Sequence, residues 1–426
     1  MLQDYLPGIP TSSMTISLRT ALRKLFNVFY RTRFAEIITG VEVFITLGIL
    51  KLDISSNKSE KIRMRTVVLA APDGGNIGDR MMLLSVLNKV DGPCRIFSES
   101  SAEITLLPGR YQKPETVQIK DLYHRIPSFG LPALLKFGRQ IRHSSSVLII
   151  GADLMDGKYN YIASLHRLQL LHLANRLGVQ TKVLGFSWGE ELENSLISYI
   201  KNHCEDTKFC LRDPISKYRL DKLGVKKTFL TSDLVFSLPL IIRRPMQNYA
   251  ISTHPYCVIN GSGLISNSPR SKQVYVDIIK KLIDRDFHIF LIPHVIRNTD
   301  NDLRILSSIY QEFHDSGQVV LINNLLSPQE LIEYCAGASL VLTSRMHLAI
   351  LSLLSGTPPI TFASHGKVEG LLRYFGLDHL CVSEILDSPE NLSKLVDRYL
   401  LEFNDMKVQI SKTLPHVIQV SSSNFE

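Results

Sequence analysis

Cysteine and tryptophan are scarce in this sequence. Its 426 residues include six cysteines and one tryptophan. The cysteines are scattered, mostly lie within or beside apolar runs, and form no pair with the spacing of metal ligands. This pattern favours buried, reduced thiols in a cytosolic compartment over a disulfide framework or a structural metal site.

A long uninterrupted apolar run is also missing. The segment Phe34–Leu50 has only 17 residues and is interrupted by Glu36 and Glu42, so we do not expect it to span a membrane. Residues 1–15 have neither the basic start nor the apolar core of a cleavable signal peptide. Five basic residues precede the apolar segment: Arg19, Arg23, Lys24, Arg31 and Arg33. For residues 19–50 we therefore predict one of two arrangements: peripheral contact with a membrane surface, or a helix packed on the body of the protein.

Acidic residues are outnumbered, and the formal net charge is +8. The excess is concentrated in residues 1–65, which hold ten Lys and Arg against five Asp and Glu. A nucleic acid is one partner for such a charge, but no aromatic-basic interleaving, zinc spacing or recognition-helix pattern supports it. An anionic membrane surface or a phosphate-bearing substrate fits better, and we expect no nucleic-acid partner.

Short apolar runs that alternate with helical patterns fill the rest of the chain. Such runs are typical of the buried strands of a parallel sheet covered by helices on both faces. The alternation begins at Thr66, stops in the polar stretch 241–255 and then restarts. We therefore predict an α/β fold with two Rossmann-like domains facing across a cleft and an N-terminal helical extension. The expected boundaries are 1–62 for the basic and apolar extension with its linker, 63–245 for the first domain and 250–426 for the second.

One segment of the second domain has the character of a site. Residues 339–343 form a short apolar strand, Ser344 is a candidate N-cap, and Gly356 ends the helix that follows. That helix is almost entirely apolar, yet Arg345 and His347 occupy its first turn. Free backbone N–H groups and the positive end of the helix dipole attract anions there. The sequence therefore predicts a binding site for a small multivalent anion.

This arrangement resembles the signature of the polysaccharide pyruvyl transferases. The resemblance includes Ser344-Arg345-x-His347, the stop Gly356-x-Pro358, and Lys367 after the next strand. Weaker matches precede them in the expected order: GGNIGD at Gly74–Asp79, RDPIS at Arg212–Ser216, SDLVF at Ser232–Phe236, and Pro293-His294 at a strand end. The family usually carries a run of glycines after the strand Val147–Ile150, where this chain reads Gly151-Ala152-Asp153.

The resemblance implies a transferase with a GT-B-like arrangement of its two domains. In the family, phosphoenolpyruvate gives its three-carbon unit to two hydroxyls of a sugar, which yields a cyclic ketal and inorganic phosphate. The expected partners are phosphoenolpyruvate and a sugar or lipid-linked oligosaccharide of a cell-surface polysaccharide or exopolysaccharide. We expect no cofactor and no metal, and a cytoplasmic protein that is either free or peripheral at the inner face of the plasma membrane.

The pyruvyl transfer implied by the resemblance suggests a role for each of the matched residues. Arg345 can donate paired hydrogen bonds to a carboxylate or phosphate, and His347 is the candidate general acid. Asp213 is expected to cap a helix, whereas Asp300 and Asp302 are expected to be surface carboxylates. The residues expected to bind substrate are Arg212, Lys367, His294, Asn76, Asp79 and Ser344.

Two other functions remain open on the sequence. A GT-B-type nucleotide-sugar glycosyltransferase would normally carry an acidic nucleotide-binding motif in its second half, for which Glu369 alone is thin support. A non-catalytic glycan-binding member of the same fold is the other alternative, and the altered Gly151-Ala152-Asp153 loop would fit it. Phosphate release from phosphoenolpyruvate in the presence of glycans distinguishes all three.

Overall fold

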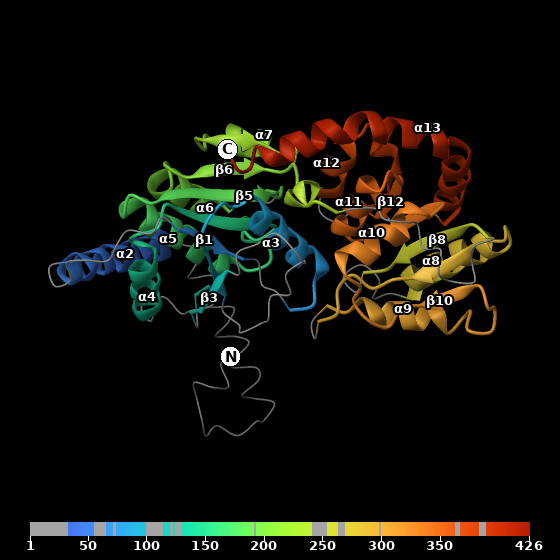
Figure 1. Cartoon of the computed structure of the whole chain (residues 1–426), viewed down its shortest axis with the longest axis horizontal. Helices are drawn as coiled ribbons and strands as arrows, with labels where there is room; N and C mark the ends of the chain where they lie inside the picture. Colours follow the sequence, from blue (N-terminus) through green and yellow to red (C-terminus); the bar gives the residue numbers. More distant parts are fainter. Residues whose placement is uncertain are drawn as a thin grey trace, which may run out of the picture.

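Two parallel β-sheets lie side by side along the long axis of the molecule (Figure 1). The computed structural model describes residues 33–54, 65–70, 74–98, 114–119, 122–123, 130–190, 193–240, 254–262, 269–297, 300–362, 367–382 and 389–426. In these residues the first sheet has seven strands and the second has six. Helices cover both, so the chain has the predicted α/β architecture with two Rossmann-like halves.

The first sheet has the order β3-β2-β1-β4-β5-β6-β7, and all of its strands pair in parallel. Its strands are β1 Thr66–Leu69, β2 Cys94–Ser98, β3 Glu115–Gln118, β4 Ser146–Ala152, β5 Gln180–Phe186, β6 Lys208–Leu211 and β7 Thr228–Leu230. The helices of this half are α2 Arg33–Ile54, α3 Ile77–Lys89, α4 Leu131–Ile141, α5 Tyr161–Arg176, α6 Asn194–His203, α7 Pro214–Lys222 and the 3₁₀ turn η2 Leu234–Ser237.

The second sheet has the order β10-β9-β8-β11-β12-β13, again with parallel pairing. Its strands are β8 Tyr256–Asn260, β9 His288–Leu291, β10 Val319–Leu321, β11 Leu340–Thr343, β12 Pro359–Phe362 and β13 Cys381–Val382. Its helices are α8 Pro269–Ile283, α9 Asp302–Tyr310, α10 Pro328–Ala336, α11 Met346–Leu354, α12 Lys367–Tyr374, η3 Asp378–Leu380 and α13 Pro389–Ser422.

In each sheet the strand order reverses at one place, between β1 and β4 and between β8 and β11. Crossover helices leave opposite faces of a parallel sheet at such a point, which opens a crevice at the carboxyl ends of the strands. Ligands of doubly wound folds bind in that crevice. The loops after these four strands are therefore where the site is expected.

The helix α2 belongs to the predicted N-terminal extension and packs against α4 and α5. Ala35, Val43 and Leu50 of α2 are fully buried, and they join the core on the α4/α5 side of the first sheet. The structure thus has the packed helix that the sequence offered as one of two alternatives. No helix of the described residues is both long and apolar enough to cross a bilayer.

The last helix, α13, runs from the second half back to the first (Figure 1). At its end, Ser421 Oγ donates to the backbone oxygen of Asp233 at 2.8 Å, and Asn424 Nδ2 donates to that of Ser232 at 3.0 Å. The end of α13 therefore fixes the turn that leads into η2. This turn carries Asp233, which belongs to the site described next.

Candidate active site between the two sheets

The GGNIGD motif, which spans the turn before α3 and the first residues of that helix, contacts the turn after β9 in the other half. Ile296 donates its N–H to the oxygen of Gly75 at 2.8 Å, and Ile77 donates to that of His294 at 3.3 Å. Asn76 and Val295 form an isolated antiparallel bridge. The segment after β1 and the turn after β9 are thus joined by backbone hydrogen bonds, and the motif is part of the junction between the halves.

Asn76 and Asp79 have structural partners at this junction. Asn76 caps α3 by accepting the N–H of Gly78 at 2.9 Å, and its Nδ2 donates to Asp79 Oδ2 at 2.9 Å. Arg297 of the other half donates to the same oxygen at 2.5 Å and to the Gly74 carbonyl at 3.1 Å. Burial raises the pKa of Asp79, although Arg297 opposes the shift.

Arg297 is a residue that the sequence did not single out. It lies three positions after His294, in the turn that follows β9, and this nearness to His294 is the one feature of the sequence that could have drawn attention to it. Its partner Asp79 is more than 200 positions away in the chain, so the pair becomes visible only in the folded protein.

His294 lies fully inside the junction. It is 1% exposed, and neither ring nitrogen has a hydrogen-bond partner in the described part of the protein. Its ring is nearly parallel to that of His347, with centroids 6.4 Å apart and an angle of 10° between the planes. Burial first, then the positive charges of His347 and Arg345, lower the pKa of His294 well below its ordinary value.

His347 stands in the first turn of α11 and faces the first half. Its Nε2 is 3.7 Å from Asp233 Oδ2 and, like the nitrogens of His294, makes no hydrogen bond to a described residue. Burial, aided by Arg212, lowers the pKa of His347, while Asp233 opposes the shift. The imidazole is therefore neutral at pH 7 in the unliganded protein and becomes a stronger proton donor than usual once it is protonated.

Arg345 occupies the N-cap position of α11, and its guanidinium is already paired. Nη2 donates to Asp300 and to Asp302 at 2.6 Å each, and Nε donates to Asp302 at 3.2 Å. The remaining nitrogen, Nη1, makes no hydrogen bond to a described residue. Arg345 therefore offers one donor to a ligand, where the sequence led us to expect the full paired fork.

The prediction that Asp300 and Asp302 are surface carboxylates is wrong. Asp302 is completely buried, and the side chain of Asp300 is 16% exposed. Besides Arg345, Asp302 accepts hydrogen bonds at 3.0 Å from the N–H groups of His294 and Val295. Asp302 thereby ties the turn of His294 to the start of α11.

Ser344 is not the helix cap that the sequence predicted, because α11 begins one residue later than expected. Its buried Oγ accepts the N–H of Ser262 at 2.6 Å, and Thr343 Oγ1 accepts the N–H of Arg345 at 3.0 Å. Both hydroxyls therefore fix the end of β11. As a ligand for substrate, Ser344 stays a prediction.

Arg212 extends from the end of β6 into the same region, and its side chain is 3% exposed. It donates through Nη1 to Asp233 at 2.9 Å, through Nε to Ser187 Oγ at 2.8 Å, and through Nη2 to Asp153. Two carboxylates thus neutralise the charge of this arginine, and each of its three nitrogens already donates within the protein. Arg212 is therefore not free to bind a substrate anion in this arrangement. Asp213 caps α7, as predicted, by accepting the N–H of Ser216 at 2.7 Å.

The altered loop after β4 supplies one of these carboxylates. Ala152 has a φ of 46°, a left-handed conformation that glycine adopts at little cost, so the family's usual glycines have a backbone reason here. The turn directs Asp153 to Arg212. The loop therefore combines a left-handed turn at Ala152 with a carboxylate that pairs with Arg212.

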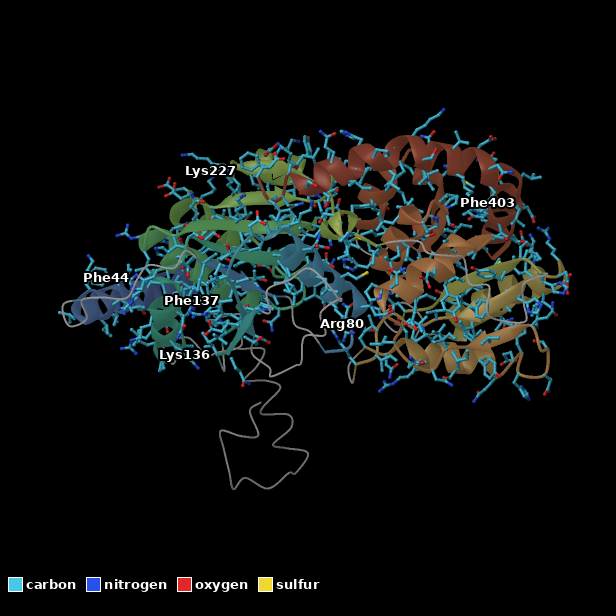
Figure 2. All side chains as sticks on the ribbon, in the orientation of Figure 1. Phe44, Arg80, Lys136, Phe137, Lys227 and Phe403 are labelled. Carbon is cyan, nitrogen blue, oxygen red and sulfur yellow. The ribbon has the colours of Figure 1, made fainter. Side chains whose placement is uncertain are left out.

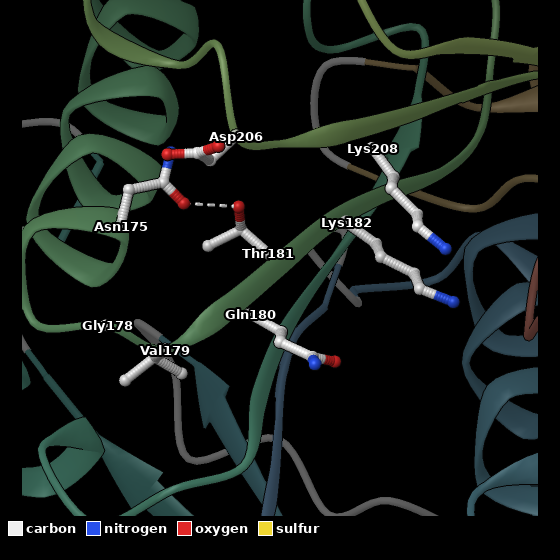
Figure 3. Close-up of a pocket in the computed structure, with 8 residues that line it drawn as sticks. All are labelled: Asn175, Gly178, Val179, Gln180, Thr181, Lys182, Asp206 and Lys208. Carbon is white, nitrogen blue, oxygen red and sulfur yellow. Dashed lines mark hydrogen bonds between the residues drawn. The ribbon is translucent and has the colours of Figure 1, made fainter.

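Lys367 is the first residue of α12, and its side chain lies outside the described residues. No group of three or more His, Cys, Asp and Glu among the described residues is placed to hold a metal ion. A hollow of about 370 Å³ opens at the other, amino-terminal edge of the first sheet, where Lys182 and Lys208 lie next to each other on β5 and β6 (Figure 3). By topology this hollow is separate from the site.

The site thus brings together His347, His294, Arg345, Arg212, Asn76 and Asp79. Its chemistry is that of two imidazoles with unbonded nitrogens beside carboxylates, at the junction of two Rossmann-like halves. His294 is fully buried and the side chain of His347 is 13% exposed. Such groups can give or accept a proton in a region that excludes most water.

The fold is that of GT-B glycosyltransferases and the related sugar-nucleotide epimerases. UDP-GlcNAc 2-epimerase from Methanocaldococcus jannaschii superposes with a TM-score of 0.53 at 12% identity, covering 79% of this chain and 92% of that one. Trehalose-6-phosphate synthase OtsA gives 0.53 at 10% identity, covering 85% and 97%. Anabaena Alr3699/HepE, solved with UDP-glucose, gives 0.56 at 7% identity, covering 85% and 96%.

Comparison with the sequence profiles of protein families identifies the family within this fold. The profile of the polysaccharide pyruvyl transferases matches residues 76–366, which is more than half of the chain. The chain belongs to this family, as its motifs predicted, and is a transferase of polysaccharide biosynthesis. No curated protein matches it.

Proposed function

We propose that this protein transfers the pyruvyl unit of phosphoenolpyruvate to two hydroxyls of a sugar. A proton is added to the methylene carbon, and the first hydroxyl oxygen bonds to C2 as it loses its proton. The second hydroxyl oxygen then displaces the phosphate from C2 and gives up its proton. The products are a cyclic ketal that carries the carboxylate, and inorganic phosphate.

The observation that carries this proposal is the state of His347 in a chain of this family. Its side chain is only 13% exposed, its buried Nε2 is unbonded among the described residues, and Asp233 lies 3.7 Å away. An imidazole of lowered pKa is a poor resting acid at pH 7, but a bound trianion would raise its pKa by direct Coulomb attraction. In this proposal, donor binding protonates His347, which then delivers the proton to the methylene carbon.

The other groups have supporting roles in the proposal. Arg345 Nη1, the first N–H groups of α11 and Lys367 bind the carboxylate and phosphate, and the same charges stabilise the departing phosphate. His294 contributes a second neutral nitrogen beside His347. Asp153, whose side chain is 29% exposed, accepts hydrogen bonds from the sugar hydroxyls on the side of the first half.

The acceptor class follows from the family: a sugar of a cell-surface polysaccharide or exopolysaccharide, free or lipid-linked. We place the reaction in the cytoplasm, where its donor is made. No cofactor is needed, because the donor brings both the carbon unit and the leaving group.

The test is incubation of the full-length protein with phosphoenolpyruvate and a panel of oligosaccharide acceptors. We expect acceptor-dependent phosphate release and a glycan whose mass grows by one pyruvyl ketal. A parallel reaction with UDP-sugars measures UDP release. UDP release without phosphate release would replace the proposal with a glycosyltransferase, and glycan binding without either would indicate a non-catalytic member.

A further inference from the structure

The helix α2 has one face on the protein and one face in solvent. Its buried face carries Ala35, Thr39, Val43, Thr46 and Leu50, which recur at helical spacing and pack against α4 and α5. In Figure 1 this helix forms the end of the molecule that is farthest from the second half. Its outward face therefore lies far from the junction that holds the candidate site.

Glu36 and Glu42 of α2 turn toward the protein. Glu42 is 5% exposed and accepts Gln169 Nε2 at 2.8 Å. Glu36 accepts Asn202 Nδ2 at 3.1 Å and lies 3.4 Å from His203 Nε2. The two acidic residues that interrupt the apolar segment in the sequence are thus absent from its outward face.

That outward face is apolar over about four turns. Ile37, Val41, Phe44, Ile45 and Leu52 are 60%, 50%, 76%, 42% and 74% exposed. Their spacing puts all five on one stripe of the helix. Phe44 stands at the outer end of the molecule in Figure 2. Exposed apolar stripes of this length mark contact with a partner or a membrane.

We propose that this stripe of α2 docks in the interfacial layer of a bilayer that contains anionic lipids. The helix lies flat, because its other face is bound to the protein and because residues 37–52 extend only about 22 Å along the axis. The basic residues near the stripe favour an anionic lipid surface over the apolar groove of a protein as its binding partner. Residues 5–35, at and before the start of α2, contain five Lys and Arg and no Asp or Glu, and exposed Lys51 lies next to Leu52 at the end of the stripe.

Flotation of the full-length protein with lipid vesicles tests this proposal. One set of vesicles is phosphatidylcholine alone, and the other also contains phosphatidylglycerol. We expect binding to the anionic vesicles that weakens with added salt and with Arg23→Gln/Lys24→Gln. The double variant Val41→Gln/Phe44→Gln should bind roughly tenfold more weakly, because two apolar side chains no longer enter the interface.

The matched control is Leu401→Gln on α13, because Leu401 is 86% exposed and lies on the second half. It should bind vesicles like the unaltered protein. Val41, Phe44 and Leu401 are exposed, so replacing them should leave the thermal melt unchanged. Thermal melts of all variants exclude misfolding as the cause of lost binding.

Three results would overturn the proposal. One is no binding to either kind of vesicle, and another is equal binding by the Val41→Gln/Phe44→Gln variant. The third is a dimer without lipid, in sedimentation velocity, that this variant dissociates, since the stripe would then bind a second copy of the chain. The assay uses neither phosphoenolpyruvate nor an acceptor, so its outcome is independent of the proposed reaction.

Discussion

Gly78 of the first half packs directly against the imidazole of His347 in the second half. A Cβ atom at position 78 would lie 2.6 Å from His347 Cγ and 2.9 Å from Cε1, closer than nonbonded carbon atoms approach. The third glycine of the GGNIGD motif and the histidine of the Arg-x-His motif are therefore two sides of one contact. This contact explains why both motifs occur in the same chain.

Gly78→Ala should displace His347 or separate the two halves. We expect a loss of about 1–3 kcal/mol in the free energy of unfolding, as for other overpacked sites, and a larger loss of phosphate release than of donor binding. Urea unfolding and steady-state kinetics measure the two effects. Gly40→Ala on α2 is the control, because nothing lies within 4 Å of a Cβ there. Unchanged turnover in Gly78→Ala would show that the position of His347 is not critical.

His347→Asn keeps a polar side chain of similar shape but removes the proton donor. We expect turnover to fall by about 10²–10⁴-fold with donor affinity largely preserved, as for the loss of a general acid. Single-turnover kinetics and calorimetric titration with phosphoenolpyruvate separate the two quantities. If the variant retains near-normal turnover, the imidazole is not the general acid. The only role left for this site would then be the binding of an anion.

Arg345→Lys keeps the charge but cannot bridge Asp300 and Asp302 while presenting another donor. Because Asp302 is completely buried, we expect a cost of about 1–3 kcal/mol in unfolding free energy together with weaker donor binding. Arg398→Lys is the matched control, since Arg398 forms an exposed pair with Glu402. Surface pairs contribute little, so its unfolding free energy should stay within about 0.5 kcal/mol. Equal effects of both substitutions would contradict the structural role of Arg345.

Arg297→Met removes the cation that reaches from the second half to Asp79. The carboxylate then loses the partner that opposes its raised pKa, so the junction should weaken and activity should fall. Asp79→Asn in the same chain removes the unpaired charge and should restore part of the lost stability. Urea unfolding of both single variants and the double variant gives the coupling energy between the two residues. Additive effects would show that the ion pair does not hold the halves together.

The pH dependence of stability should report the buried imidazoles. Folding lowers the pKa values of His294 and His347. At the same pH the unfolded chain therefore binds more protons at these two histidines than the folded chain does. The stability that they contribute is therefore complete above their ordinary pKa of 6.5 and is lost as the pH falls below it.

Thermal melts between about pH 7.5 and 5.5 test this dependence. The unaltered protein should lose stability on acidification, and His294→Asn should lose less. His172, whose pKa burial lowers to about 4, contributes equally to both proteins and so cancels in the comparison. Identical pH profiles would show that His294 does not carry the effect.

The sequence by itself determined the fold class, the family and most of the strands. The predicted strand at residues 339–343 is β11 Leu340–Thr343, and the predicted strand Val147–Ile150 lies within β4 Ser146–Ala152. Asp213 caps α7 as expected. These features depend on local chemistry, since apolar runs, caps and prolines act within a few residues. Four strands were not predicted. β3, β7 and β13 are edge strands without a fully buried residue, and β2 mixes polar and apolar positions without a clear alternation.

Only the tertiary structure decided which charges meet. The sequence predicted that Arg345 and Arg212 are available to bind an anion and that Asp302 lies at the surface. In the structure each arginine is paired with two carboxylates, and Asp302 is buried. The same holds for Glu42, which the sequence placed in an apolar segment and which the fold turns toward Gln169. Periodicity tells which side chains share a face of an element. The partner of a buried charge depends on distant segments that meet only when the two halves close, and so no local pattern encodes it.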